Sequence, residues 1–298
     1  MGPNSFQLAM GLKIVGYPAL AASVGLVIAR LLPAGSRLRT ATLTAAAAAG
    51  LITSHVGLAG APPWPPIDSM GWIPIVTGAT ALALIVIALA VPRRAVALAT
   101  TALLAVATLA AVYYAGHPTF LRSLDRYWAL AGLAAGGVIA AAGLVQDAGG
   151  RSVRPAPWLA WVVVGAGLAG CTVWSHSALV AMLLGSAAVT AGVLGVGGAV
   201  LGVRDVGAAP AGVVLVHIAA TAVYAHLYAK LPGWVLATAL LAALAPIAVA
   251  MAMSATGRRR WIAAAVGVAV AAGLTGLAAR RMYAQDAASA KDASSMYY

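Results

Sequence analysis

Long apolar stretches run through the whole sequence, separated by short breaks that hold the charged residues and many of the prolines. Each stretch has roughly 18 to 25 residues, which is enough for a helix to cross the hydrocarbon core of a bilayer. We predict ten such helices, at residues 12–32, 40–60, 73–91, 95–115, 127–146, 157–174, 178–202, 211–230, 234–254 and 261–281. The predicted fold is therefore an all-α, polytopic transmembrane helical bundle.

The apolar pattern ends near residue 282, and a polar segment of mostly small residues follows it. We predict a transmembrane helical domain at residues 1–282 and a polar C-terminal tail at residues 283–298. On its own such a tail is expected to be disordered. Its last two residues, Tyr297 and Tyr298, are candidates for docking onto a partner protein.

Composition excludes a soluble globular protein. Hydrophobic residues make up 63% of the chain and charged residues only 8%, whereas about a quarter of residues are charged in globular domains. The net charge of +12 comes from Lys and Arg in short loops. There these residues set topology and contact lipid head groups, so we expect the bilayer as a partner and no nucleic acid.

The distribution of basic residues predicts an orientation. With the N-terminus outside, most of the 18 Lys and Arg residues fall in loops on the cytoplasmic side. Cytoplasmic loops carry an excess of these residues. We therefore predict a bacterial inner-membrane protein with both termini in the periplasm.

Acidic residues are absent from the predicted spans. The chain has no glutamate, and its six acidic residues are aspartates that lie outside the apolar stretches. Carboxylates within spans usually mark proton or ion pathways, so the pattern disfavours an ion-coupled transporter. Phosphate-binding loops, paired carboxylates and metalloprotease motifs are also missing. We predict a non-catalytic structural or accessory subunit, or a scaffold, of a larger membrane complex, with no cofactor.

Residues 61–72, here named the Pro-Trp loop, contain four prolines together with Trp64 and Trp72. Proline favours an extended path, and tryptophan suits the boundary between membrane and water. The loop is predicted to form a stiff cap on the outer side of the bundle. The alternative is a docking surface, in which Trp64 and Trp72 contact the partner.

Four of the five histidines occur near the outer ends of even-numbered predicted spans: His55, His117, His176 and His226. Two histidines from facing helices are a common way to hold haem in a membrane. Pairing His55 with His117 and His176 with His226 predicts two haem b sites. His217 lies roughly 180° around its helix from His226 and is left out. The simpler interpretation is that these histidines lie at the interface or pack inside the bundle.

This layout resembles that of the haem-A synthase family, in which histidines on even-numbered helices serve haem. That family has eight spans and a glutamate-containing motif beside a helix histidine, and the chain matches neither feature. We therefore keep a haem-b-binding membrane redox protein as an alternative function. A carrier for a neutral or hydrophobic substrate is a further alternative, for which Pro18 and Pro246 could divide helices into halves.

Three short stretches carry a second resemblance. They are Ser54–Leu58 leading into Pro62–Pro66, Ser177–Gly185, and Tyr228–Pro232. Together they resemble an uncharacterised, planctomycete-type family of multi-pass inner-membrane proteins. The resemblance implies a membrane location and a histidine at the position of His55, but no known activity.

Overall fold

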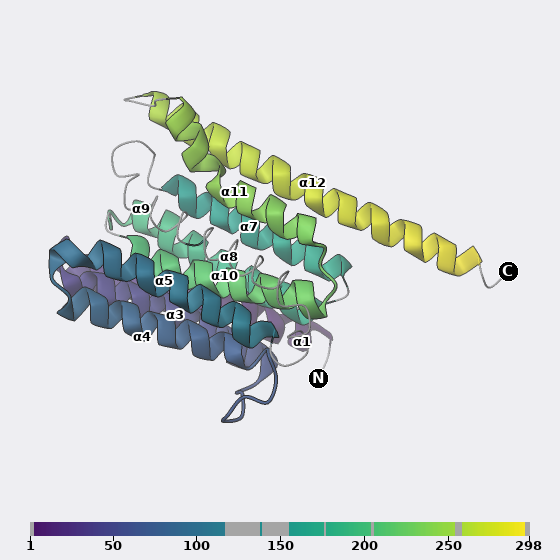
Figure 1. Ribbon diagram of the computed structural model, residues 1–298, viewed down its shortest axis with the longest axis horizontal. Coiled ribbons are helices and arrows are strands. Elements are labelled where there is room, and N and C mark those ends of the chain that lie inside the picture. The colour runs from purple at the N-terminus through teal and green to yellow at the C-terminus, as the bar shows by residue number, and fades with distance from the viewer. Residues whose placement is uncertain are drawn as a thin grey trace.

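The computed structural model describes residues 3–116, 138, 155–175, 177–203, 206–253 and 258–295. Within these residues every regular element is helical, which confirms the all-α class. Eight of the helices are long and apolar enough to cross a membrane. The chain is thus built as a multi-pass helical membrane protein (Figure 1).

Most of the described elements are long helices. In order they are α1 (Pro3–Gly11), the π-helix η1 (Leu12–Gly16), α2 (Tyr17–Leu31), α3 (Arg37–Ala59), α4 (Trp72–Ala90), α5 (Arg93–Gly116), α7 (Pro155–Trp174), α8 (Ala178–Gly192), the π-helix η3 (Val193–Gly197), α9 (Gly198–Val200), α10 (Ala208–Tyr228), α11 (Gly233–Ala252) and α12 (Arg259–Ser295).

Eight of the ten predicted spans match these helices, but the count of ten is not confirmed. The prediction at 234–254 corresponds to α11, whose apolar section Gly233–Pro246 is shorter than a full span. The prediction at 127–146 lies outside the described residues, except for Val138.

Local chemistry explains where several helices begin, end or change shape. The Ser36 side chain accepts a hydrogen bond from the Arg39 backbone N–H (3.2 Å) and caps α3. The Arg37 guanidinium donates to the Leu89 carbonyl at the end of α4 (2.7 Å). Pro18 cannot donate a backbone hydrogen bond, and the helix widens into the π-helix η1 just before it.

Helix α10 is the centre of the bundle. It packs against α3, α4, α5 and α8, and 83% of its spanning segment is buried, the largest share among the eight candidate spans. Its sequence is apolar on every side, as expected for a helix enclosed by others. The side chains that α10 presents therefore face other helices.

A second group of helices, α7, α11 and α12, packs together at the top of Figure 1. Its contacts depend on glycine. A Cβ at Gly267 of α12 would collide with the backbone of Pro246 in α11, and one at Gly167 of α7 would lie 2.7 Å from Thr275 Cβ in α12. In a lipid bilayer the hydrophobic effect does not drive helices together. Small residues instead let helix backbones approach closely and pack against each other.

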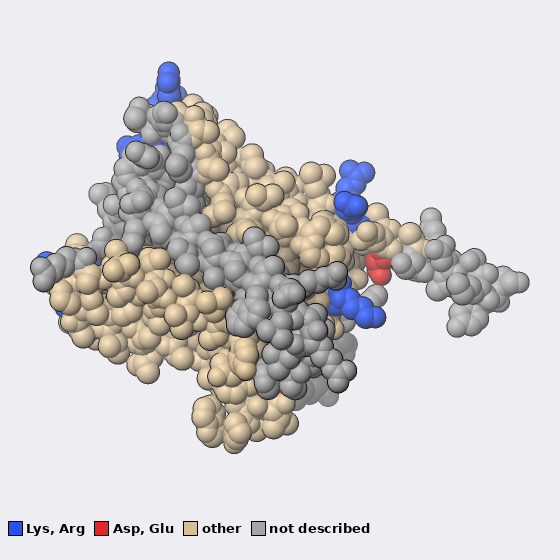
Figure 2. All heavy atoms as spheres, viewed as in Figure 1, with Lys and Arg blue, Asp and Glu red and all other residues tan. Residues whose placement is uncertain are grey.

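Charged side chains lie at the extremities of this bundle. Figure 2 shows Lys and Arg at its ends and projecting corners, away from the middle of the helices. One end carries the Pro-Trp loop, the end of α10 and the C-terminal end of α12, and we name it the Pro-Trp end. Helix α12 continues past residue 282 and projects beyond the other helices at this end (Figure 1).

Candidate functional site

Two histidines meet inside the bundle. His55, one turn from the end of α3, and His217, in the middle of α10, have ring centroids 6.5 Å apart with the rings nearly perpendicular at 88°. Their side chains are 1% and 0% exposed, respectively. Buried polar rings are uncommon and are normally hydrogen-bonded. This pair is therefore the main candidate site among the described residues.

Thr77 of α4 holds the His217 ring in place. Its hydroxyl lies 3.0 Å from His217 Nδ1 and 2.8 Å from the Ile73 carbonyl one turn earlier in α4. All three groups are buried. Three helices, α3, α4 and α10, thus bring the two histidines and the threonine together.

At least one nitrogen of each imidazole has no hydrogen-bond partner among the described residues. In the described part of the protein, His55 Nδ1 and His217 Nε2 are both buried and unpaired. A buried polar atom left unpaired generally costs about 1–3 kcal/mol relative to one that is paired. The pair is consequently a place where a further ligand would be stabilised.

The predicted histidine pairs are not the pair that the structure brings together. His226 lies near the end of α10, where its Nδ1 is hydrogen-bonded to the Leu231 carbonyl. His117 and His176 lie outside the described residues, so the pairs His55–His117 and His176–His226 stay predictions. Sequence reasoning kept His55 but missed His217, because it compared His217 only with His226 on the same helix.

A second polar cluster fastens the Pro-Trp loop to the bundle. Ser69 in the loop is hydrogen-bonded to the Tyr228 hydroxyl at the end of α10 (2.8 Å). The Asp68 carboxylate accepts from the Gly71 backbone N–H (2.6 Å), and the Tyr224 and Tyr228 rings stack 4.7 Å apart. These contacts fit the predicted cap.

The predicted docking residues have different surroundings. The ring of Trp72 stacks on Tyr114 of α5 with a centroid distance of 4.2 Å. Trp64 points outward and is 79% exposed. Tyr297 and Tyr298 lie outside the described residues. Of the two tryptophans, Trp64 is thus the one available for contact outside the bundle.

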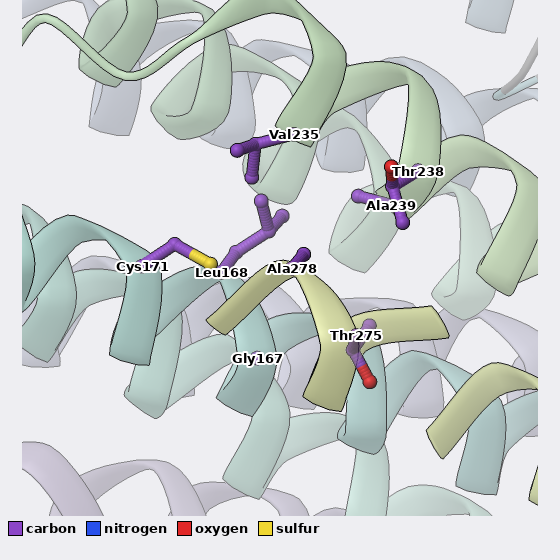
Figure 3. A pocket seen from close by; sticks show the side chains of 8 residues that line it. All are labelled: Gly167, Leu168, Cys171, Val235, Thr238, Ala239, Thr275 and Ala278. Atoms are coloured by element: carbon purple, nitrogen blue, oxygen red, sulfur yellow. The ribbon is translucent and has the colours of Figure 1, made fainter. Parts of the chain in front are cut away.

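A small cavity lies between α7, α11 and α12, which are not the helices that carry the histidine pair. It measures about 10 Å³ and is lined by Gly167, Leu168, Cys171, Val235, Thr238, Ala239, Thr275 and Ala278 (Figure 3). That volume accommodates at most one water molecule. The cavity is a packing gap and not a substrate site.

The described residues contain no group of three or more His, Cys, Asp or Glu side chains placed to hold a metal ion. The fold and site together define a multi-pass helical membrane protein with a buried histidine pair. Comparison with family models, with curated proteins and with solved structures finds no match to the chain. The resemblance to a planctomycete-type family accordingly stays a prediction.

Proposed function

We propose that the protein is a non-catalytic accessory subunit or scaffold of a larger complex in a bacterial inner membrane. The observation that carries this proposal is the length of α12. The helix runs for 37 residues from Arg259 to Ser295, which at 1.5 Å per residue is about 55 Å. A hydrocarbon core of about 30 Å leaves roughly 25 Å of this helix outside the membrane interior.

The projecting section of α12 has a fixed base. The Arg281 guanidinium lies 5.0 Å from the centre of the Trp234 ring in α11, and Tyr283 meets Trp174 of α7 edge-on at 5.8 Å. A helix anchored in this way reaches a partner already ordered, so binding does not have to order it first. The exposed Trp64 lies in the loop at the same end and would add a second contact.

The proposed orientation places the Pro-Trp end in the periplasm. The connections at the opposite end carry Arg30, Arg37, Arg93 and the run Arg258–Arg260. An excess of Lys and Arg is typical of the cytoplasmic side. Both termini, and with them the projecting end of α12, would then face the periplasm.

The proposal can be tested by native electrophoresis of membranes extracted in a mild detergent. Full-length protein should migrate in a complex larger than one chain. Removal of residues 286–298 should release a free chain at an unchanged level in the membrane, and Trp64→Ala should weaken the complex partially. Val86→Ala is the matched control, because Val86 is 53% exposed on α4 within its span and should face lipid.

A full-length chain that extracts and migrates as a single subunit would contradict the proposal. So would a shortened chain that stays in the complex together with a Trp64→Ala variant that does the same. The carrier alternative draws no support from the cavity in Figure 3, which is too small for a substrate.

A further inference from the structure

The hydrogen bonds around Thr77 determine which nitrogen of His217 carries its proton. A hydroxyl has one hydrogen, and Thr77 donates it to the Ile73 carbonyl. The Thr77 oxygen then accepts the Nδ1 hydrogen of His217, so that two hydrogen bonds form. The opposite arrangement, in which Thr77 donates to Nδ1, forms only one. His217 Nε2 is therefore the nitrogen with a free lone pair, and among the described residues it is buried without a hydrogen-bond partner.

A proton-bearing nitrogen held by a second residue is typical of metal-binding histidine. In such sites the outer hydrogen bond orients the ring and leaves the other nitrogen to bind the ion. Thr77 occupies this outer position toward His217. His55, the neighbouring ring, also has a buried nitrogen, Nδ1, with no partner in the part of the chain that the structure describes.

The separation of the rings fits one ion between two ligands. A direct hydrogen bond between two imidazoles brings their centroids to about 5 Å. Two nitrogens at about 2 Å from one ion place the centroids roughly 5 Å apart at a tetrahedral angle and roughly 6 Å apart when they lie opposite. The observed 6.5 Å is nearest to the last arrangement.

We propose that His55 and His217 form a two-coordinate binding site for a monovalent copper ion, Cu(I), with Thr77 as the positioning residue for His217. Zinc normally takes four ligands, and the described residues offer no third His, Cys, Asp or Glu beside the pair. Helices α3, α4 and α10 also contain no carboxylate to offset a second positive charge. An ion of the lowest charge is thus the least costly to bury.

Close packing around the pair favours a single ion over haem. One residue after Thr77, a Cβ at Gly78 of α4 would lie 3.3 Å from Ile52 of α3. On α10, a Cβ at Gly212 would collide with Leu104 of α5. Side chains thus already occupy the space beside Gly78 and Gly212, whereas a porphyrin needs a pocket of several hundred Å³.

A cation would approach the pair from the Pro-Trp end. His55 lies four residues before the end of α3, and the Pro-Trp loop follows directly. Asp68 lies in that loop, where its carboxylate accepts a hydrogen bond from the Gly71 backbone N–H. A carboxylate at this position would attract a cation toward the pair from the aqueous side.

Anaerobic titration of the purified full-length chain with Cu(I), against a coloured Cu(I) chelator, tests the site. We expect one Cu(I) per chain, and an X-ray absorption spectrum with two nitrogen neighbours at about 2 Å. His55→Gln and His217→Gln should each weaken binding by more than about 100-fold, and Thr77→Val by about 10-fold. His226→Gln is the matched control and should bind as the unaltered protein does.

The measurements on the unaltered chain decide the outcome even if a histidine variant fails to fold. A chain that takes up no Cu(I), or that shows three or more ligand atoms around it, overturns the proposal. So does tighter binding of Zn(II), or a haem absorption band in protein purified from its native membrane. Equal loss of binding in His226→Gln would show that the ion is held elsewhere.

Discussion

The group of α3, α4 and α10 and the group of α7, α11 and α12 are held together in different ways. In the first, buried His217 and Thr77 are joined by a hydrogen bond between helices. In the second, Gly267 lies directly against the Pro246 backbone, and Gly167 lies against the Thr275 side chain. The comparison teaches that small residues already let helices of this protein approach closely, so the buried polar groups in the first group call for another explanation.

The largest effect is expected where backbone meets backbone. Gly267→Ala places a Cβ against Pro246, whose backbone cannot move aside easily, and should destabilise the protein by about 3 kcal/mol. Gly273→Ala is the matched control on the same helix, since a Cβ there meets no described residue within 4 Å. It should be neutral or stabilising by up to about 1 kcal/mol.

A thiol-reactive dye gives the measurement for this pair of variants. Cys171, the only cysteine in the chain, is 1% exposed on α7. The temperature at which Cys171 begins to react should fall for Gly267→Ala and should stay the same or rise for Gly273→Ala. Equal midpoints for the two variants would mean that the contact with Pro246 is not limiting.

The next largest effect is expected at the hydrogen bond between Thr77 and His217. Thr77→Val removes the partner of His217 Nδ1 and should destabilise the protein by about 1–2 kcal/mol in the absence of metal. Thr80→Val is the matched control, because the Thr80 hydroxyl is buried in the same helix and bonds to the Val76 carbonyl (2.7 Å). The difference between their thermal midpoints in detergent isolates the bond to His217. Equal thermal midpoints would show that the bond between Thr77 and His217 does not stabilise the fold.

A smaller effect is expected at the Pro-Trp loop. The hydrogen bond between Ser69 and Tyr228 should contribute a coupling free energy of about 0.5–1 kcal/mol. A double-mutant cycle with Ser69→Ala and Tyr228→Phe separates this bond from the other contacts of each residue. Hydrogen exchange at the loop amides gives the readout, and strictly additive effects would show that the two residues act independently.

The smallest effect is expected for Trp64→Ala. The Trp64 side chain is 79% exposed. Its removal should change the free energy of unfolding by no more than about 0.5 kcal/mol, as measured by the thermal midpoint. Trp72→Ala should cost about 1 kcal/mol more, because it also loses the stacked contact with Tyr114. Equal losses for both variants would show that Trp64 contacts the fold as Trp72 does.

Much of the fold could be predicted from the sequence because burial in a bilayer imposes a length on each apolar stretch. The ends were harder to place. The span predicted at 40–60 begins at Arg37, because Ser36 caps the helix. The span predicted at 261–281 is part of a helix that continues to Ser295. Loss of apolar residues indicates where the membrane ends, whereas alanine continues a helix in water as well.

The candidate site could be predicted only in part. His55 stands out because it lies near the end of a predicted span. Its neighbour His217 is 162 positions away along the chain, and its contact with Thr77 crosses 140 positions. No periodic pattern within one helix reports such contacts, because they arise from the packing of α3 and α4 on α10.

The projecting part of α12 has a consequence for the geometry of any assembly. A continuous helix transmits both height and direction, since each added residue lifts its tip by 1.5 Å and turns it by about 100°. One residue inserted after Tyr283 would thus turn the contact face away from its partner, whereas seven residues would nearly restore the direction about 10 Å higher. The number of residues in α12 would therefore set both the height and the direction at which the protein meets its partner.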